Sequence, residues 1–239
     1  MFHVKRTHDP TAIARGSLLA GQRGTLYNRS VVDATRLRQL LEPFGLDLSS
    51  SQTNQTLAYL QLLLRWNQKI NLTAIRDPEV CVTRHFGESL FLARHVQFHG
   101  NLLDIGSGAG FPGLALKIVF PGIAVTLLEP VAKKRAFLKE TARVCGFRQV
   151  EVRGERLEEL ARAASAPAFD FATMRAVGNL EALVPLAALY LKPGGSLLLW
   201  LTHDQAAGLA TIESGLTWAD PLPVPLSRSG IICRGTKRA

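Results

Sequence analysis

The spacing of apolar positions changes about a hundred residues into the chain. Before Gly100, apolar residues recur at intervals of three and four, most clearly at Leu37, Leu40, Leu41 and Phe44. This spacing places apolar side chains on one face of a helix. After Gly100, short apolar runs alternate with helical stretches, which is typical of a parallel sheet with helices on both faces. The pattern therefore predicts an N-terminal helical cap followed by an α/β domain.

Capping and turn signals give the boundaries of the cap helices. Gly45 ends the first helix, the serine run 49–51 begins a second helix that continues through Trp66, and Asp77 followed by Pro78 begins a third helix toward His95. We expect residues 31–99 to form this cap. Residues 1–30 show no sustained periodicity and are expected to be a mobile basic lead-in.

The second part, residues 100–239, predicts five strands and four intervening helices. The strands are expected at residues 101–105, 124–129, 150–153, 169–174 and 196–201, and the helices near residues 112–120, 131–145, 155–164 and 179–191. The turn 192–195 connects the fourth helix to the fifth strand. The final segment, with Pro221, Pro223 and Pro225, predicts an antiparallel edge pair, since proline is tolerated at sheet edges. The predicted fold is thus a Rossmann-like, mostly parallel sheet with an antiparallel edge.

The net charge of +9 is carried at the two ends of the chain. Residues 1–40 hold seven Lys or Arg against two Asp, and residues 227–239 hold four Lys or Arg and no acid. Within the neutral body, residues 130–156 hold eight Lys or Arg against three Glu. Such clusters suit a polyanion, because each neutralised phosphate releases counterions. A solvated helix face with a basic tail is the alternative.

Composition also bears on location and metals. Cys81, Cys145 and Cys233 are odd in number and far apart, which disfavours disulfides or a zinc site and favours a reducing cytoplasm. No apolar run approaches the roughly 20 residues that cross a bilayer, and no signal peptide is recognisable. The Arg-rich start also fits an organellar transit peptide. We expect a cytoplasmic protein with no membrane contact and no metal.

The strongest motif is the run DIGSGAGFPG at residues 104–113, where the first predicted strand ends and a helix begins. Ligands of open parallel sheets bind at the carboxyl ends of the strands. Glycines let the backbone approach a ligand closely, and the following helix N-terminus favours an anionic group. Gly108, Gly110 and Gly113 also satisfy the G-x-G-x-x-G spacing of nicotinamide dinucleotide sites, so this cofactor is the alternative.

Two acids favour S-adenosylmethionine over a nicotinamide. Asp104 precedes the first glycine, where an acid can receive the ammonium of a methionine moiety. Glu129 ends the second predicted strand, where a carboxylate can accept both ribose hydroxyls of an adenosine. A purely structural tight turn would not need the second acid.

Several spaced motifs accompany the glycine loop. They are Trp66-Asn67 with Asn71-Leu72-Thr73, Arg84-His85 with Ser89, Lys133-Lys134 with Phe137-Leu138, Arg156-Leu157-Glu158, and Arg175-Ala176. With the loop, they resemble the bacterial 16S ribosomal RNA guanine-N7 methyltransferases, formerly called glucose-inhibited division protein B. The resemblance runs from about Leu57 to Leu201. It implies a class I S-adenosylmethionine methyltransferase that acts on 16S ribosomal RNA or the 30S subunit, without an obligate protein partner.

The resemblance also implies a set of site residues. In that family, the positions matching Gly106, Phe111, Leu157, Glu158 and Arg175 surround the cofactor or approach the reacting base. Together with the residues read from the loop and strand ends, the expected cofactor-binding set is Asp104, Gly106, Gly108, Gly110, Phe111, Glu129, Leu157, Glu158 and Arg175. The RNA-binding candidates are Arg84, His85, Lys133, Lys134 and Lys139. Arg84 and His85 are equally explained as an intramolecular tether, and Trp66 and Asn71 as packing of the cap.

Arg175 is the candidate for positioning the substrate. It directly follows an apolar strand at the same sheet edge as the glycine loop, and its planar guanidinium can stack on a base or bind a phosphate. No general base is expected, because guanine N7 already carries a free lone pair. The chain also lacks the Asn/Asp-Pro-Pro-aromatic motif that orients an exocyclic amine.

The sequence departs from the family pattern at four places. The family usually has proline at Ala109, aspartate at Glu88 and serine at Met174, and it has Lys-Gly after the fifth strand, where this chain has Thr202-His203. The missing lysine removes a phosphate contact. The alternatives to an RNA enzyme are a small-molecule or protein methyltransferase on the same fold and, further away, a nicotinamide-dependent oxidoreductase or an inert RNA-binding module.

Overall fold

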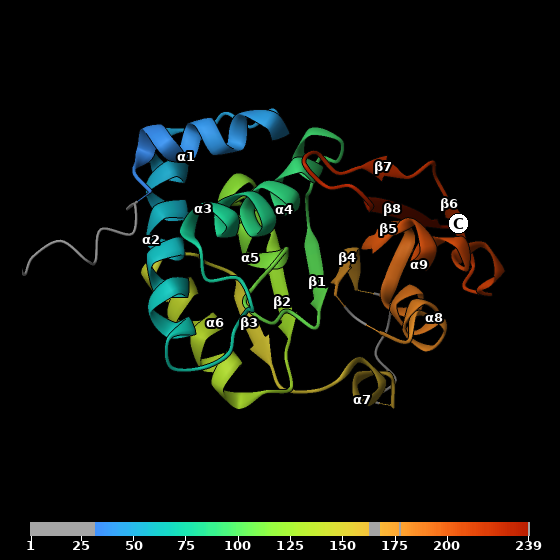
Figure 1. The fold of residues 1–239 in the computed structure, drawn as a ribbon. Coiled ribbons are helices and arrows are strands. Elements are labelled where there is room, and N and C mark those ends of the chain that lie inside the picture. The colour runs from blue at the N-terminus through green and yellow to red at the C-terminus, as the bar shows by residue number, and fades with distance from the viewer. Residues whose placement is uncertain (1–31, 163–167, 177, 239) are drawn as a thin grey trace, which may run out of the picture. The chain divides into compact units, whose positions relative to one another are not determined.

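The computed structural model describes residues 32–162, 168–176 and 178–238 (Figure 1). The predicted lead-in of residues 1–30 lies outside these described residues. From Val32 onward the chain is one compact unit, built on an eight-stranded sheet. The predicted cap and sheet regions are therefore parts of a single unit.

One long helix and several short helices build the cap. In chain order they are α1 (Ala34–Leu41), η1 (Glu42–Phe44), α2 (Ser50–Asn67), α3 (Pro78–Cys81), η2 (Val82–Gly87), α4 (Glu88–Leu90) and η3 (Phe91–Arg94). Two expected signals act at helix starts: Ser49 forms a capping box with Gln52, and Asp77 caps α3. Asp33, which was not predicted as a cap, accepts a hydrogen bond from the Arg36 amide at the start of α1. The third predicted helix has the expected extent but is irregular, since η2 is a π-helical segment and η3 is a 3₁₀ turn.

The sheet carries five parallel strands and an antiparallel extension. The strands are β1 (Asn101–Ile105), β2 (Ala124–Leu128), β3 (Val150–Arg153), β4 (Phe169–Arg175), β5 (Leu191–Thr202), β6 (Leu216–Trp218), β7 (Leu222–Pro223) and β8 (Gly230–Lys237), in the order β3-β2-β1-β4-β5-β8-β6, with β7 also paired to β8. β8 runs antiparallel to β5, β6 and β7. This is the predicted mostly parallel sheet with an antiparallel edge.

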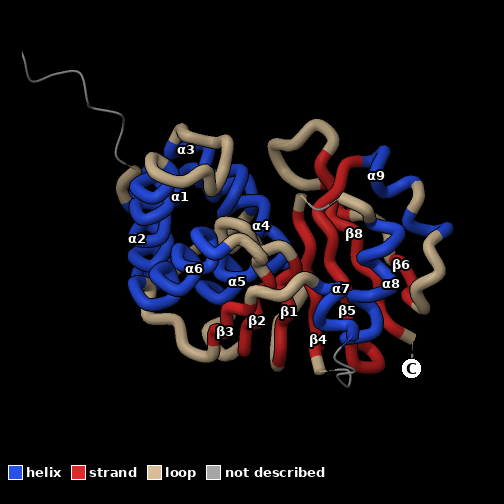
Figure 2. Tube along the Cα trace, turned by 90° about the horizontal axis from the view of Figure 1, so that it is seen from below, coloured by secondary structure: helices blue, strands red, loops and turns tan. Residues whose placement is uncertain are grey.

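Helices pack on both faces of the sheet. They are α5 (Gly113–Val119), α6 (Ala132–Val144), α7 (Leu157–Arg162), α8 (Leu180–Tyr190), α9 (His203–Ala207) and η4 (Leu209–Thr211). In Figure 2, α1 to α6 gather beside β1 to β3, whereas α7 and α8 lie against β4 and β5.

Alternating strand residues supply two separate cores. On β1, Leu102 joins the core shared by α1, α2, α5 and α6, and Leu103 joins the core closed by α7 and α8. This alternation follows from the two-residue period of a strand. The cap thus closes the same core as one face of the sheet, because Leu41, Phe44 and Tyr59 belong to the first cluster.

One sequence-based boundary is wrong in an informative way. β5 begins at Leu191 rather than at residue 196, because Leu191 already pairs with Phe169 before a register shift, and the predicted turn 192–195 lies inside the strand. Where the related family has Lys-Gly, Thr202 instead caps α9, with Gln205 completing a capping box. The departure from the family pattern therefore coincides with the start of a helix.

Candidate functional site

The carboxyl ends of β1, β2 and β4 meet at one edge of the sheet, here called the carboxyl edge. Ile105 pairs with Leu128 of β2 and with Met174 of β4. The residues that follow these three positions, Gly106, Glu129 and Arg175, therefore lie at the same level, at the end of the strands. The topology brings together the loop, the second acid and the arginine that the sequence singled out.

Asp104 is buried at the carboxyl edge, with 1% of its surface exposed. The Thr173 hydroxyl donates a hydrogen bond to Asp104 Oδ1 at 2.8 Å, whereas the buried Oδ2 has no hydrogen-bond partner among the described residues. Burial raises the pKa of this carboxyl to about 6, although the hydrogen bond from Thr173 opposes the rise. A buried acceptor without a donor is costly, so this position favours a cationic partner.

Glu129 connects the glycine loop to the next helix. Its Oε2 accepts a hydrogen bond from the Gly108 amide and its Oε1 accepts one from the Val131 amide, both at 2.9 Å. The carboxylate is 4% exposed. Each carboxylate oxygen has more than one acceptor position, so both can accept a further hydroxyl. Glu129 therefore fixes the loop and keeps acceptor capacity.

The loop glycines serve two different needs. Gly108 has a φ of 55°, and the nearest heavy atom to a Cβ built there is the Gly106 carbonyl oxygen at 3.8 Å, so the space beside it is open. Gly110 has a φ of 87°, and a Cβ there would lie 2.9 Å from Leu114 and would also collide with the Tyr59 hydroxyl. Gly110 is thus required by packing, whereas Gly108 leaves room beside the backbone.

An aromatic stack links the cap to the loop. The Phe111 ring lies between Tyr59, at a centroid distance of 5.1 Å and 7° between planes, and His85, at 4.9 Å and 16°. The Tyr59 hydroxyl donates a hydrogen bond to the Ala109 carbonyl. Phe111 therefore stacks against two protein rings, and this residue holds the loop against α2 and η2.

Arg175 is bound to the cap rather than extended into solvent. Its Nη2 lies 2.7 Å from Glu88 Oε2, its Nη1 donates to Ser89 Oγ at 3.2 Å, and the side chain is 16% exposed. From its position after an apolar strand, this side chain was expected to stack on a base or bind a phosphate at the sheet edge. In the structure the guanidinium joins β4 to η2 and α4, because Glu88 is buried and needs a cation.

The π-helical geometry of η2 supplies another partner for Arg175. The Glu88 amide donates to the carbonyls of Thr83 and His85 and skips the Arg84 carbonyl, which instead accepts a hydrogen bond from Arg175 Nη2 at 2.6 Å. Short π segments often occur at functional sites. Here the segment exposes a carbonyl that a regular α-helix would use internally.

Arg84 and His85 form the intramolecular tether considered from the sequence. Arg84 Nη1 lies 2.9 Å from Glu88 Oε1, although the arginine side chain remains 48% exposed. His85 Nε2 lies 2.9 Å from Thr73 Oγ1. Burial, with the nearby positive charges of Arg175 and Arg84, lowers the pKa of His85 to about 3. The imidazole is therefore neutral at physiological pH.

The remaining predicted residues are spread around the edge. Leu157 is buried in the core under α7, whereas Glu158 is exposed on that helix. Lys133 and Lys139 are exposed on α6, and Lys134 is half-buried. No group of three or more His, Cys, Asp or Glu side chains that could hold a metal occurs among the described residues. Nor is any helix in the described ranges long and apolar enough to cross a membrane.

Comparison with known proteins decides the family. A family model described as GidB, rRNA small subunit methyltransferase G, matches residues 52–216. The chain belongs to this family. It is therefore a methyltransferase that uses S-adenosylmethionine, as predicted, and not a nicotinamide-dependent oxidoreductase.

Individual relatives agree with this family assignment. A ribosomal RNA small subunit methyltransferase G from Chloroflexus aggregans is 41% identical over 175 residues, covering 72% of this chain and 74% of the relative. The protein of the same name from Stenotrophomonas maltophilia strain K279a is 39% identical over 201 residues, covering 83% and 90%.

Solved structures show the same class I methyltransferase fold. A ribosomal protein L11 methylase from Lactobacillus delbrueckii aligns with a TM-score of 0.54 and 15% identity, covering 65% of this chain and 79% of the other. An S-adenosylmethionine-dependent methyltransferase from Aquifex aeolicus aligns at 0.52 and 15%, covering 62% and 89%. At this identity the likeness establishes the fold alone, which confirms the predicted fold class.

Two residues that support the carboxyl edge were not predicted from the sequence. Thr173 holds Asp104, and its only sequence signal is a hydroxyl inside an otherwise apolar strand, opposite Asp104 in the β1–β4 pairing. Tyr59 is fully buried in α2 and gave no signal beyond helical periodicity. Its contact with the loop depends on how the cap packs against the sheet.

Proposed function

We propose that the chain transfers a methyl group from S-adenosylmethionine to N7 of a guanine in 16S ribosomal RNA. The observation that carries this proposal is the buried Oδ2 of Asp104, which has no hydrogen-bond partner among the described residues, in a member of this methyltransferase family. The cofactor supplies an electrophilic methyl group on a sulfonium. The protein's task is to align a nucleophile with that methyl in a dry pocket.

The residues of the carboxyl edge suit this cofactor. Asp104 Oδ2 would receive the ammonium group, which replaces a missing hydrogen bond with a charge-assisted one. Glu129 would accept the ribose hydroxyls with its remaining lone pairs while its bond to the Gly108 amide holds the loop. The open side of Gly108 lets the backbone pass close to the ligand.

The chemistry of the edge favours an acceptor that needs no deprotonation. His85 is neutral, but it is stacked on Phe111 and hydrogen-bonded to Thr73, so it is committed to structure. Arg175 remains charged and cannot act as a base. Guanine N7 offers a lone pair directly, and Arg175 at the same edge would position the base or an adjacent phosphate.

A basic surface next to the edge supports an RNA substrate. Helix α6 begins shortly after Glu129 and presents exposed Lys133 and Lys139, with Lys134 half-buried. Arg84 is half-exposed on η2 and is a further candidate for a phosphate contact. These cations would hold the RNA backbone, while the loop and Arg175 handle the methyl group and base.

The test is tritiated methyl transfer to 30S particles, naked ribosomal RNA and total protein from a bacterial strain lacking the gene. We expect label in the small-subunit RNA of the first or second sample. Borohydride reduction followed by aniline should then cut the RNA at the modified guanine, and primer extension should map one break. Labelled protein would refute the RNA assignment, and labelled RNA that resists cleavage would move the reaction to another atom.

A further inference from the structure

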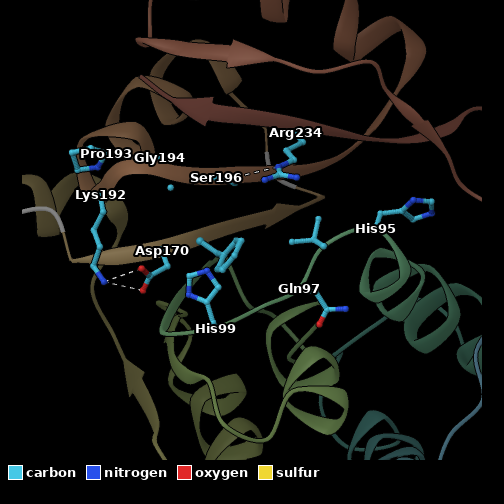
Figure 3. Close-up of a pocket in the computed structure, with 12 residues that line it drawn as sticks. His95, Gln97, His99, Asp170, Lys192, Pro193, Gly194, Ser196 and Arg234 are labelled. Atoms are coloured by element: carbon cyan, nitrogen blue, oxygen red, sulfur yellow. Dashed lines mark hydrogen bonds and ion pairs between the residues drawn. The ribbon is translucent and has the colours of Figure 1, made fainter. Parts of the chain in front are cut away.

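A polar cavity lies at the opposite edge of the sheet from the glycine loop. Its volume is about 310 Å³, and its polar lining includes Gln97, His99, Asp170, Lys192, Ser196 and Arg234 (Figure 3). Asp170 stands near the start of β4, whereas Arg175 ends the same strand. We call this cavity the amino-edge pocket. Its volume is at the lower end of the range for small-ligand sites.

Asp170 and Lys192 neutralise each other in this pocket. Lys192 Nζ lies 2.9 Å from both carboxylate oxygens, and the Asn101 amide donates to Oδ2 at 2.8 Å. Burial opposes ionisation of Asp170, but the hydrogen bonds from Asn101 and Lys192 outweigh it and lower its pKa. Asp170 is therefore ionised, hydrogen-bonded and paired with Lys192. Its charge does not determine the net charge of the pocket.

Arg234 carries the remaining positive charge of the amino-edge pocket. Its Nε donates to Ser196 Oγ at 3.2 Å, a neutral partner, and no carboxylate among the described residues forms an ion pair with it. In Figure 3 the guanidinium reaches from β8 toward the loop that carries Gln97 and His99. Two further groups on that loop can donate hydrogen bonds, the Gln97 amide and the His99 ring.

We infer that the amino-edge pocket binds a phosphate group through Arg234. A guanidinium matches phosphate geometry with two parallel hydrogen bonds, and Gln97 and His99 line the same pocket. The phosphate would come from the backbone of substrate RNA or from the free ion. The RNA source rests on the proposed function; binding of the free ion does not.

Titration with inorganic phosphate tests the pocket alone. Calorimetry at low ionic strength should show binding to the wild-type protein that Arg234→Gln abolishes. Asp104→Asn should retain it, which separates this pocket from the carboxyl edge. Arg228→Gln is the matched control, because Arg228 is an exposed arginine shortly before β8 and its loss changes the net charge equally. Equal phosphate binding by the Arg234 and Arg228 variants would overturn the inference.

Binding of a small-subunit RNA transcript distinguishes the two sources. If RNA occupies the pocket, Arg234→Gln should weaken binding about tenfold relative to Arg228→Gln and lower the salt-dependence slope by about one. Phosphate binding without this RNA effect would assign the pocket to the free ion. Arg234→Lys keeps the positive charge and should retain part of the affinity. It replaces Arg234→Gln as the test if that variant does not fold. Failure of RNA methylation by the wild type would refute the proposed function and leave the phosphate titration decisive.

Discussion

Thr173 donates its hydroxyl to one oxygen of Asp104, and the other, buried oxygen has no hydrogen-bond partner in the part of the chain that the structure describes. Asp104→Asn keeps the shape of this side chain but removes the charge that would meet an ammonium group. Because charge-assisted hydrogen bonds contribute about 1.5 to 3 kcal/mol, we expect the dissociation constant for S-adenosylmethionine to rise at least roughly tenfold. Calorimetric titration measures this dissociation constant. An unchanged value in a folded variant would show that Asp104 does not bind the cofactor.

The raised pKa of Asp104 predicts a pH dependence of stability without cofactor. The folded-state pKa of about 6 lies above the ordinary value of 3.8, so the folded protein binds this proton more tightly than the unfolded chain does. The resulting stabilisation is complete below pH 4 and is lost as the pH rises through 6. Asp104→Asn should therefore gain in melting temperature relative to wild type between pH 4 and 7. A difference in melting temperature between the two proteins that stays constant from pH 4 to 7 would contradict the prediction.

Gly108 and Gly110 form a natural pair for substitution, because both have positive φ but different surroundings. Gly110→Ala forces a Cβ against Tyr59 and Leu114 and should destabilise folding by a few kcal/mol, since overpacking and backbone strain add. Gly108→Ala carries the strain without the collision, so it should fold better and chiefly weaken cofactor binding. Chemical denaturation and cofactor titration of both variants check this. Equal stability losses would refute the distinction.

Arg175 has a structural role that must be separated from a role in positioning substrate. Arg175→Ala should lower methyl transfer at least about tenfold with little change in cofactor affinity, the pattern of a lost transition-state contact. It should also destabilise the fold, because buried Glu88 loses a partner. Adding Glu88→Gln should restore stability but not turnover. If the double variant regains turnover, Arg175 acts only through the cap.

Helix α6 should contribute to RNA affinity through charge. Lys133→Ala with Lys134→Ala should flatten the log–log dependence of RNA binding on salt by up to about two, since each phosphate contact contributes about one. Arg38→Ala with Lys69→Ala removes two exposed cations from the cap and serves as the control. Fluorescence anisotropy over a salt series gives both slopes. Identical slopes for the two double variants would show that α6 is not part of the RNA interface.

The local pattern predicted the strands and the glycine loop well, because each depends on neighbouring residues. β1 and β3 have the expected bounds, and Asp104 and Glu129 reach the same edge because parallel strands end together. Long-range partners were not predictable in the same way. Burial of Glu88, which follows from the packing of the cap against β4, determines where Arg175 points.

The β5 boundary and Gly110 illustrate the same limit. The turn residues at 192–195 indicated a break, but pairing of Leu191 with β4 extends the strand through them. The spacing of Gly110 matched a ligand-binding pattern, yet the space above it is filled by Tyr59, about fifty residues earlier in the chain. Such contacts depend on tertiary packing rather than on local propensity.

The core shared by the cap and the sheet has a consequence for synthesis on the ribosome. Leu41, Phe44 and Tyr59 are made before the strands and helices that cover them, since β1, α5 and α6 emerge later in translation. The nascent cap must keep an apolar face uncovered until roughly residue 144 has left the exit tunnel, and the ion pair of its Glu88 forms only after Arg175, at the end of β4, has been made. The helices that come first in the chain therefore acquire their native packing only after much of the sheet has been made.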